Sequence, residues 1–415
     1  MPVGRISLEY IELFAGIGGF RLGFEQACDE LGVKAKCVFS SEINKFSRQT
    51  YKANFGEEPV GDITQIASKD IFPYRNRKKT DILGLFAGFP CQPFSRAGKQ
   101  EGWSDKRNMI PHMLRIIEDL KPDFFILENV KGFKSKNFRD VYDRLMWDLK
   151  VACGYTVYEK VYNANAVVPQ HRERIFFVGF KNHTHFVFPE LPEIYPALKD
   201  ILIDDVPEKY FLKESTWKWL KKHKYERLAK SSGFGYTIAD VNGRARTISA
   251  RYGCDGAECL IAKSVKSVHK AVQVGQIGEG RQGERIYDVN NIACTQTSIS
   301  GGLGSKTGLY EVSSKVRKLT PRECARVMGF PDDFKIVVSD SQAYKQFGNA
   351  VVPGVVECIA GSVLKEIEFK TTLKKSRKTE IEYNPLLDAA LNTMRNNFLL
   401  EWEIKNNLRL IMPCY

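Results

Sequence analysis

The chain has 415 residues, of which 43% are hydrophobic and 27% charged, a composition typical of ordinary globular proteins. Its 62 Lys and Arg residues outnumber its 49 Asp and Glu residues, and the resulting charge of +13 suits a polyanionic partner. No stretch approaches the roughly 20 apolar residues that span a bilayer, and Arg5 and Glu9 interrupt the run that a secretory signal would need. We therefore expect a cytoplasmic protein with no membrane segment, whose ten cysteines are reduced thiols.

Short apolar runs alternate with amphipathic stretches through residues 1–182. The apolar runs predict strands, and the stretches between them predict helices behind Gly-rich or polar turns. This order predicts an α/β fold, with a doubly wound, mostly parallel sheet and helices on both faces. Ligands of such folds bind at the carboxyl ends of the strands. The predicted strands cover 8–14, 36–41, 82–87, 123–127 and 174–180, and the predicted helices cover 19–31 and begin again at about 44.

The pattern changes after about residue 182. Residues 183–316 are rich in Pro and Gly, contain the basic run WKWLKKHKYERLAK and lack the alternation, which predicts a smaller, loop-rich inserted domain. Helical patterns return, so we expect 317–370 to rejoin the first domain. The tail, 371–415, has no function that its sequence reveals.

The turn after the first predicted strand reads FAGIGGF, and its glycines allow close approach of the backbone to a ligand at a helix start. A dinucleotide site would have a third glycine where Arg21 stands. Glu42 ends the second strand, where its carboxylate could accept hydrogen bonds from a ribose diol, and Asp62 follows in GDIT. Together these residues outline an adenosine pocket; the alternative is a tight turn, a helix N-terminal acid and a surface cap.

Cys91 lies between two prolines in GFPCQPFS, directly after an apolar strand. Most cysteines are small buried hydrophobes, but a stiff loop at a strand end is where an enzyme would hold a nucleophile. Glu128, in ENV, ends another buried strand, where a carboxylate is costly unless it is partnered or protonated. Arg172 and Arg174, in QHRER, are either a solvated charge cluster or guanidinium groups for a base edge or phosphates.

The order of these motifs resembles the cytosine-5 DNA methyltransferases, especially those of bacterial restriction–modification systems. The resemblance is dense over 1–182 and 317–360 and rests on FAGIGG, Glu42, GDIT, GFPCQPFS, ENVKG, QHRER, RKLTPRECARVMGFP and QAYKQFGNAVVP. It implies an S-adenosyl-L-methionine-dependent methyltransferase fold. It also implies methyl transfer to carbon 5 of a cytosine that is flipped out of double-stranded DNA.

The resemblance also implies roles for single residues. Cys91 would add to carbon 6 of cytosine, and a protonated Glu128 would donate to ring nitrogen 3. Arg174 would hold the exocyclic oxygen, with Arg172 supporting the site. The implied cofactor contacts are Phe14, Ile17 and Gly19 in the turn, Glu42 at the ribose, Asp62 and Ile63 at the adenine, and Pro90 and Asn349 at the methionine side. The stretch DKRNMIPHM, 105–113, departs from the family pattern, so no contact is assigned there.

Residues 281–302 resemble the recognition loops of family members that methylate GCGC-type sites. Gln282 would fill the space left by the extruded cytosine, and Arg285 would pair with a guanine edge. Thr295, Gln92 and Ser95 are the other expected DNA contacts. The alternative is a flexible hairpin with a solvated arginine, and residues 244–260 resemble segments of relatives with other specificities.

The expected partners are double-stranded DNA and a separate cognate restriction endonuclease for the same site, and the expected state is a monomer. No metal is expected, because Cys254 and Cys259 lack a second pair at zinc-finger spacing. An RNA cytosine-5 methyltransferase is disfavoured by the long basic region 183–316. A catalytically dead DNA-binding module is disfavoured by Cys91 with Glu128, and a nicotinamide dehydrogenase by Arg21.

Overall fold

The computed structural model describes residues 7–71, 82–90, 108–220, 236–262, 273–276, 285–288, 309–311 and 316–377. Side chains are described over the same ranges apart from positions 7 and 255, the three short strands between 273 and 311, and 368–377. The chain divides into two compact units, Met1–Val363 and Leu364–Tyr415. The first unit contains the sheet and the candidate site. The described part of the second is the last part of one helix.

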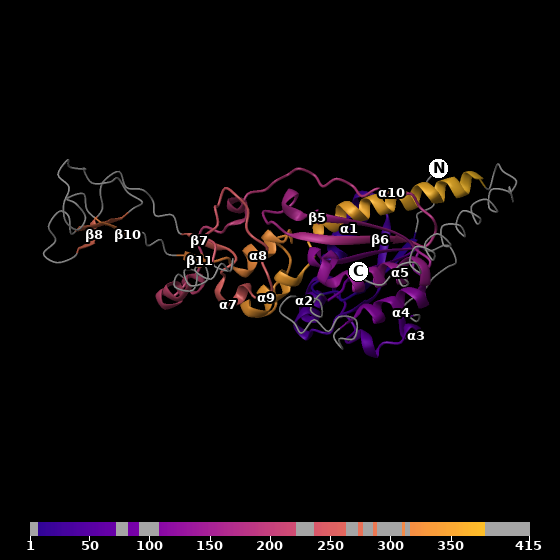
Figure 1. The fold of residues 1–415 in the computed structure, drawn as a ribbon, viewed down its shortest axis with the longest axis horizontal. Helices are drawn as coiled ribbons and strands as arrows, with labels where there is room; N and C mark the ends of the chain where they lie inside the picture. Colours follow the sequence, from indigo (N-terminus) through magenta and orange to yellow (C-terminus); the bar gives the residue numbers. More distant parts are fainter. Residues whose placement is uncertain are drawn as a thin grey trace, which may run out of the picture. The chain divides into compact units, whose positions relative to one another are not determined.

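A six-stranded sheet forms the centre of the first unit, in the order β2-β1-β3-β4-β6-β5 (Figure 1). Strands β1 to β4 are parallel, whereas β6 runs antiparallel to both β4 and β5. The predicted α/β fold with a mostly parallel sheet is confirmed. The strands span Ser7–Leu13 (β1), Lys34–Ser41 (β2), Ile82–Gly88 (β3), Phe124–Val130 (β4), Thr156–Asn163 (β5) and Glu173–Phe180 (β6).

Helices cover both faces of the sheet (Figure 1), because the central strands β3 and β4 carry apolar side chains on both faces. On one face Phe24 of α1 packs on Tyr10 and Phe86, with ring centroids 5.0 and 4.6 Å apart. On the other, Leu85 lies in the same buried cluster as Ile117 of α4. The longer helices span Gly19–Glu30 (α1), Lys45–Phe55 (α2), Ile110–Leu120 (α4), Arg139–Trp147 (α5), Pro321–Val327 (α8), Asp340–Asn349 (α9) and Pro353–Arg377 (α10).

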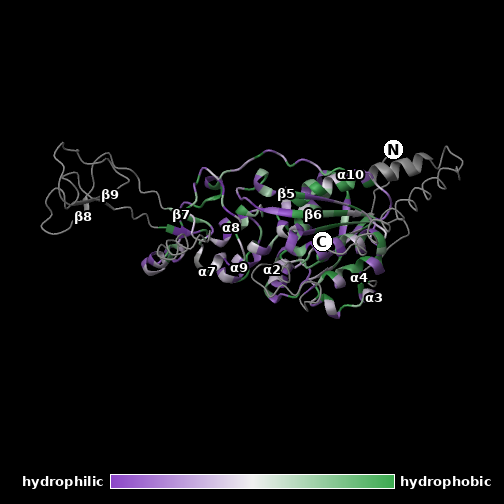
Figure 2. Cartoon of the chain, viewed as in Figure 1, coloured by the Kyte–Doolittle hydropathy of each residue, from purple (hydrophilic) through white to green (hydrophobic). Residues whose placement is uncertain are grey.

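Hydropathy follows this arrangement. Figure 2 shows hydrophobic residues concentrated in the strands of the central sheet and in the helices beside it. Strand β5 is the element of the sheet that the sequence did not predict. It lies at the edge, beside β6 alone, and exposes Val161 while burying Val157 and Tyr162. An edge strand that is only partly buried lacks the continuous apolar run that marks a central parallel strand.

The described parts of 183–316 contain short elements. Strands β8, β9 and β10 form a three-stranded sheet, and β7 pairs with β11. The absence of helix–strand alternation in these described parts agrees with the sequence, whereas the predicted limits of an inserted domain stay predictions. These elements span Tyr252–Asp255 (α7), Leu260–Ala262 (β7), Gln273–Gln276 (β8), Arg285–Asp288 (β9), Leu309–Glu311 (β10) and Val316–Lys318 (β11).

One stretch, Asp340–Ile367, is long and apolar enough to cross a membrane by length and composition, and 61% of its most apolar window is buried. It consists of α9 and the start of α10, separated at Ala350, whose backbone is extended. A buried core helix meets the same criterion, so this stretch is weak evidence of a membrane segment.

Candidate active site

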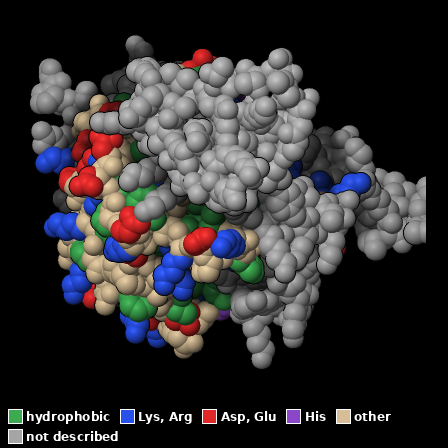
Figure 3. All heavy atoms as spheres, turned by 90° about the vertical axis from the view of Figure 1, so that its left-hand side faces the viewer, with side chains coloured by type: hydrophobic (Ala, Val, Ile, Leu, Met, Phe, Trp, Pro, Cys, Tyr) green, Lys and Arg blue, Asp and Glu red, His purple; other side chains and the backbone are tan. Residues whose placement is uncertain are grey.

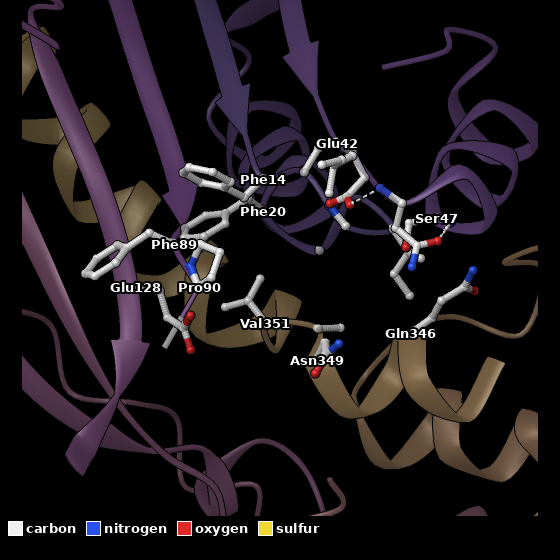
Figure 4. Close-up of a pocket in the computed structure, with 18 of the residues that line it drawn as sticks. Phe14, Phe20, Glu42, Ser47, Phe89, Pro90, Glu128, Gln346, Asn349 and Val351 are labelled. Atoms are coloured by element: carbon white, nitrogen blue, oxygen red, sulfur yellow. Dashed lines mark hydrogen bonds between the residues drawn. The ribbon is translucent and has the colours of Figure 1, made fainter. Parts of the chain in front are cut away.

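A cavity of about 420 Å³ lies where the carboxyl ends of β1, β2, β3 and β4 meet α9 (Figure 4). Its volume falls in the range of small-molecule sites, and its position follows the rule for open α/β sheets. Figure 4 shows Glu42 and Glu128 at opposite ends, with Val351 and Asn349 between them. The lining includes all eight predicted cofactor contacts and three predicted catalytic residues: Phe14, Ile17, Gly19, Glu42, Asp62, Ile63, Pro90, Asn349, Glu128, Arg172 and Arg174.

The Gly-rich turn needs its glycines for two separate reasons. Gly18 has a φ of 85°, and a Cβ there would lie 2.1 Å from the ring of Phe55. A Cβ at Gly19 would lie 2.7 Å from the carbonyl oxygen of Val351. Phe14 also has a positive φ, 55°, which is a strained backbone for a residue with a side chain. The turn therefore brings its backbone against the cavity in a conformation that few other sequences allow.

Glu42 is fixed by backbone donors at the other side of this turn. Gly16 N donates to Oε2 at 2.9 Å, and Asn44 N donates to Oε1 at 2.7 Å. Burial raises the pKa of Glu42, and these two hydrogen bonds lower it. Each oxygen of an ionised carboxylate accepts more than one hydrogen bond. Glu42 can therefore accept further donors, such as hydroxyl groups, from the cavity.

Asp62 and Ile63 form the wall next to Glu42. Asp62 caps the short 3-10 helix η1, Ile63–Gln65, because Thr64 N donates to its Oδ1 at 2.9 Å. Ile63 is buried and apolar. This wall combines one carboxylate with one apolar face, a combination that suits an aromatic ring with an exocyclic amine.

Glu128 and Arg174 form an ion pair at the opposite end, with Oε1 and Nε 3.0 Å apart. They come from the neighbouring antiparallel strands β4 and β6, in which Val130 pairs with Arg174. Burial raises the pKa of Glu128 above its usual value, although Arg174 and Arg172 both lower it. A carboxyl group in this position is therefore more readily protonated than an exposed one.

Arg172 is almost fully buried, with 1% of its surface exposed. Its guanidinium donates to the carbonyl oxygens of Ile248 at 3.2 Å, Gly348 at 3.0 Å and Ala350 at 2.8 Å. The reading of QHRER as a solvated charge cluster is thus wrong for this side chain. Arg172 joins the start of β6 to the end of α9 and to the chain near 248, and so holds the walls of the cavity together.

A second buried network, which the sequence did not reveal, lies behind the Gly-rich turn. Glu12 of β1 accepts from the backbone N of Arg21 at 3.3 Å and from the hydroxyl of Tyr51 at 2.9 Å. Because Gly18 gives α1 no side-chain cap, Glu12 acts as a cap from the adjacent strand. The Arg21 side chain pairs with Glu25 at 3.0 Å. Arg21 therefore has a structural use in place of the glycine of a dinucleotide site.

The segment GFPCQPFS, which contains Cys91, begins at the cavity. Pro90 lines it, and the carbonyl oxygen of Phe89 accepts from Asn129 Nδ2 at 3.2 Å, which ties the loop's entry to β4. Cys91 itself lies outside the described residues, as do the expected DNA contacts Gln92, Ser95, Gln282 and Thr295. Arg285 begins β9, whose backbone alone is described.

Several lining residues escaped the sequence reasoning. Met109 lies in the stretch that departs from the family pattern, directly before α4. Gln342, Lys345 and Gln346 share one face of α9 with Asn349, and this helical spacing could have revealed them. No sequence signal marks Ile43, which lines the cavity although 70% of its surface is exposed.

The family model of the C-5 cytosine-specific DNA methylases matches residues 8–365. The chain belongs to this family. It is therefore a DNA cytosine-5 methyltransferase, and the predicted activity is confirmed at that level. The match ends at residue 365, so the whole tail, 371–415, lies beyond it.

Relatives of the methylase include Type II methyltransferases of bacteria. It is 38% identical over 371 residues to M.HhaI of Haemophilus parahaemolyticus, covering 88% of this chain and 96% of that protein. It is 40% identical over 355 residues to M.NlaX of Neisseria lactamica, covering 84% and 94%. Among solved structures it is similar to the Entamoeba histolytica methyltransferase EhMeth, with a TM-score of 0.61, 19% identity and coverage of 88% and 99%. At that identity the likeness shows the fold alone.

Proposed function

We propose that this methylase transfers a methyl group from S-adenosyl-L-methionine to carbon 5 of a cytosine flipped out of a short specific site in double-stranded DNA. The observation that supports this best is a single cavity with two different ends. Glu42, Asp62 and Ile63 form a wall suited to adenosine at one end, and the Glu128–Arg174 pair lies at the other. Such a cavity can hold a methyl donor at one end and a cytosine base at the other.

The residues present fit this cofactor. Glu42 would accept the ribose hydroxyls, Asp62 and Ile63 would hold the adenine, and the turn of Phe14, Ile17 and Gly19 would enclose the centre. Gly19 supports the fit, since a side chain there would displace the Val351 carbonyl that borders the cavity. Pro90 and Asn349 would hold the methionine end. When bound, the cofactor supplies an electrophilic methyl group on a sulfonium.

The chemistry on cytosine needs a nucleophile and an acid. The Cys91 thiolate forms a bond to carbon 6, and the ring electrons move to carbon 5, which becomes able to take the methyl group. Glu128 donates its proton to ring nitrogen 3 and so prevents charge from building up on the ring. When carbon 5 takes the methyl group, the proton on ring nitrogen 3 returns to Glu128. A base then removes the hydrogen of carbon 5, the double bond between carbons 5 and 6 re-forms as the bond from carbon 6 to sulfur breaks, and the thiolate is restored.

Arg174 would orient the base. Its Nε is held by Glu128, and its Nη1 donates to the Glu173 carbonyl oxygen at 2.8 Å. Nη2 makes no hydrogen bond to the described part of the chain and can reach the exocyclic oxygen of cytosine. Arg172 would support this arrangement from behind, through the three carbonyls that it holds.

Recognition of the site is proposed for residues outside this cavity. Gln282, Arg285 and Thr295 would read or fill the duplex, with Gln92 and Ser95 beside the flipped cytosine. The names of the Type II relatives support a role in a restriction–modification system, with a separate endonuclease that cuts the same site. We further propose that the methylase acts in the cytoplasm as a monomer, with 183–316 as its target-recognition domain.

A transfer assay with a radiolabelled methyl donor tests the proposal. The full-length protein is incubated with genomic DNA, with total RNA or with neither, and the labelled nucleoside is identified after hydrolysis. We expect 5-methylcytosine from DNA only. Label in RNA alone would favour the RNA methyltransferase alternative, and no transfer to either would contradict the proposed activity.

A further inference from the structure

Arg115 of α4 holds the loop that carries Asp62 and Ile63, and it does so from outside the cavity. Nη2 of Arg115 donates to the carbonyl oxygens of Ile66 at 2.8 Å and Ile63 at 3.3 Å. Its Nη1 donates to the hydroxyl of Ser68 at 3.2 Å. One half-buried guanidinium thus spans the whole of η1 and the first residue after it.

This short helix can do little to hold itself in place. It has three residues, and its closing bond, from Ile66 N to the Ile63 carbonyl oxygen, is long at 3.4 Å. Hydrogen bonds in 3-10 helices have poorer geometry than those in α-helices, so the carbonyls of Ile63 and of Ile66, directly after the helix, gain from donors outside it. Arg115 supplies those donors in a planar, rigid arrangement that a lysine cannot reproduce.

The helix that carries Arg115 is itself well fixed. Asn108 accepts from Ile110 N at 3.1 Å at its start, and Met113, Ile116 and Ile117 on its buried face lie in the core. One turn after Arg115, Asp119 accepts a hydrogen bond from Ser68. Two side chains of one rigid helix, four residues apart, therefore hold the same loop.

We propose that Arg115 is a positioning residue for the adenine end of the cofactor site. It does not line the cavity, but it sets where Asp62 and Ile63 stand and thereby determines selectivity for adenine. This inference rests on the proposed cofactor site. It adds that the selectivity of that site depends on α4 and not on the lining residues alone.

The test compares two ligands that differ only in the base: S-adenosyl-L-homocysteine and its counterpart with hypoxanthine in place of adenine. Their dissociation constants are measured by calorimetry with the wild-type protein and with Arg115→Met, which keeps an unbranched apolar stem but has no hydrogen-bond donor. We expect the variant to lose up to about tenfold in affinity for the adenine ligand, about the contribution of one well-placed hydrogen bond. Affinity for the hypoxanthine ligand should change little. The ratio of the affinity for the adenine ligand to that for the hypoxanthine ligand should therefore fall.

Two further variants separate positioning from folding. Arg115→Lys keeps a single cationic nitrogen as donor. Its affinity ratio should lie between those of the wild type and Arg115→Met. Arg139→Met removes a helix arginine that pairs with Asp143 away from the cavity, and should leave the ratio at the wild-type value. In steady-state assays Arg115→Lys should raise KM for the methyl donor with kcat unchanged.

An equal loss for both ligands, or an unchanged ratio in both Arg115 variants, would overturn the inference. If Arg115→Met does not fold, the ratio in Arg115→Lys decides. A wild-type protein that binds neither ligand would instead contradict the proposed cofactor site. The two failures are therefore distinguishable.

Discussion

At Glu128, burial and two guanidinium groups act on the pKa in opposite directions, and burial is the larger effect. The proposed role needs the neutral acid, which can donate a proton to the ring. Glu128→Gln keeps a hydrogen-bond donor but has no proton to transfer. We expect binding of DNA and cofactor to survive, while single-turnover methylation falls by about 10²- to 10⁴-fold, the usual contribution of a general acid. Turnover within a factor of two of wild type would remove Glu128 from the mechanism.

Glu12 gives a prediction about stability. Burial raises its pKa from 4.5 to about 8, against the lowering effects of the Tyr51 hydrogen bond and the Arg21 charge. Between these two pH values the folded protein holds a proton that the unfolded chain has lost, so the free energy of unfolding falls as pH rises through this window. Urea unfolding from pH 5 to 9 should show this fall in the wild type and a flatter dependence in Glu12→Gln.

The control for Glu12 is Glu58, an exposed carboxylate that pairs with Lys52 at 3.0 Å. The pKa of Glu58 is lowered, through the hydrogen bond and the charge of Lys52, so the group is ionised in both states across this pH window. Glu58→Gln should therefore keep the wild-type slope. A wild-type slope in Glu12→Gln as well would show that Glu12 is ionised in the folded protein.

Among the elements, the Gly-rich turn is the one most sensitive to a single methyl group. Gly18→Ala combines a left-handed backbone, which costs about 1–2 kcal/mol, with a collision with Phe55, for which overpacking costs about 1–3 kcal/mol more. Gly32→Ala is a matched control, because its φ is 65° but nothing lies within 4 Å of the new Cβ. Chemical denaturation should show a larger loss of unfolding free energy for Gly18→Ala. Equal losses would mean that Phe55 moves aside freely.

The elements also show how far the sequence predicts this fold. Central strands such as β3 and β4 were predicted because both faces are buried and their sequences are continuously apolar. Residues near the carboxyl ends of these strands, such as Glu128, could be placed at one edge of the sheet for the same reason. Contacts between distant segments left no local pattern: Arg115 reaches back to Ile63, and Glu12 caps a helix that begins seven residues later.

At the scale of the whole molecule, the segment QHRER, 170–174, is joined to the chain beyond residue 183. His171 N donates to the Ala245 carbonyl oxygen at 2.9 Å, and Ile248 N donates to Gln170 Oε1 at 2.9 Å. Part of the segment 244–260 therefore has a structural contact with QHRER. Figure 3 shows Lys and Arg side chains interspersed with Asp and Glu on the described part of one face, so the charge surplus is not gathered there.

This contact concerns 244–260, one of two segments that could read the DNA sequence; the other is 281–302, which contains Arg285. If Arg285 reads a guanine, Arg285→Ala should cost about 1–3 kcal/mol of discrimination at that one base pair. Loss of a phosphate-binding lysine would instead weaken all sites alike and flatten the salt dependence. Methylation of a randomised-site library by both proteins separates these outcomes. An unchanged sequence preference in Arg285→Ala would assign the reading role to 244–260.

The central claim is covalent catalysis by Cys91, the residue that follows Pro90 in the sequence, and trapping tests it most directly. Duplex DNA made with 5-fluorocytosine lacks the proton that must leave carbon 5, so a cysteine–cytosine adduct should persist in the presence of S-adenosyl-L-methionine. We predict a denaturation-resistant protein–DNA complex for the wild type and for Cys254→Ser, an exposed cysteine away from the cavity. Cys91→Ser should give none. A complex at the wild-type level with Cys91→Ser would contradict the account.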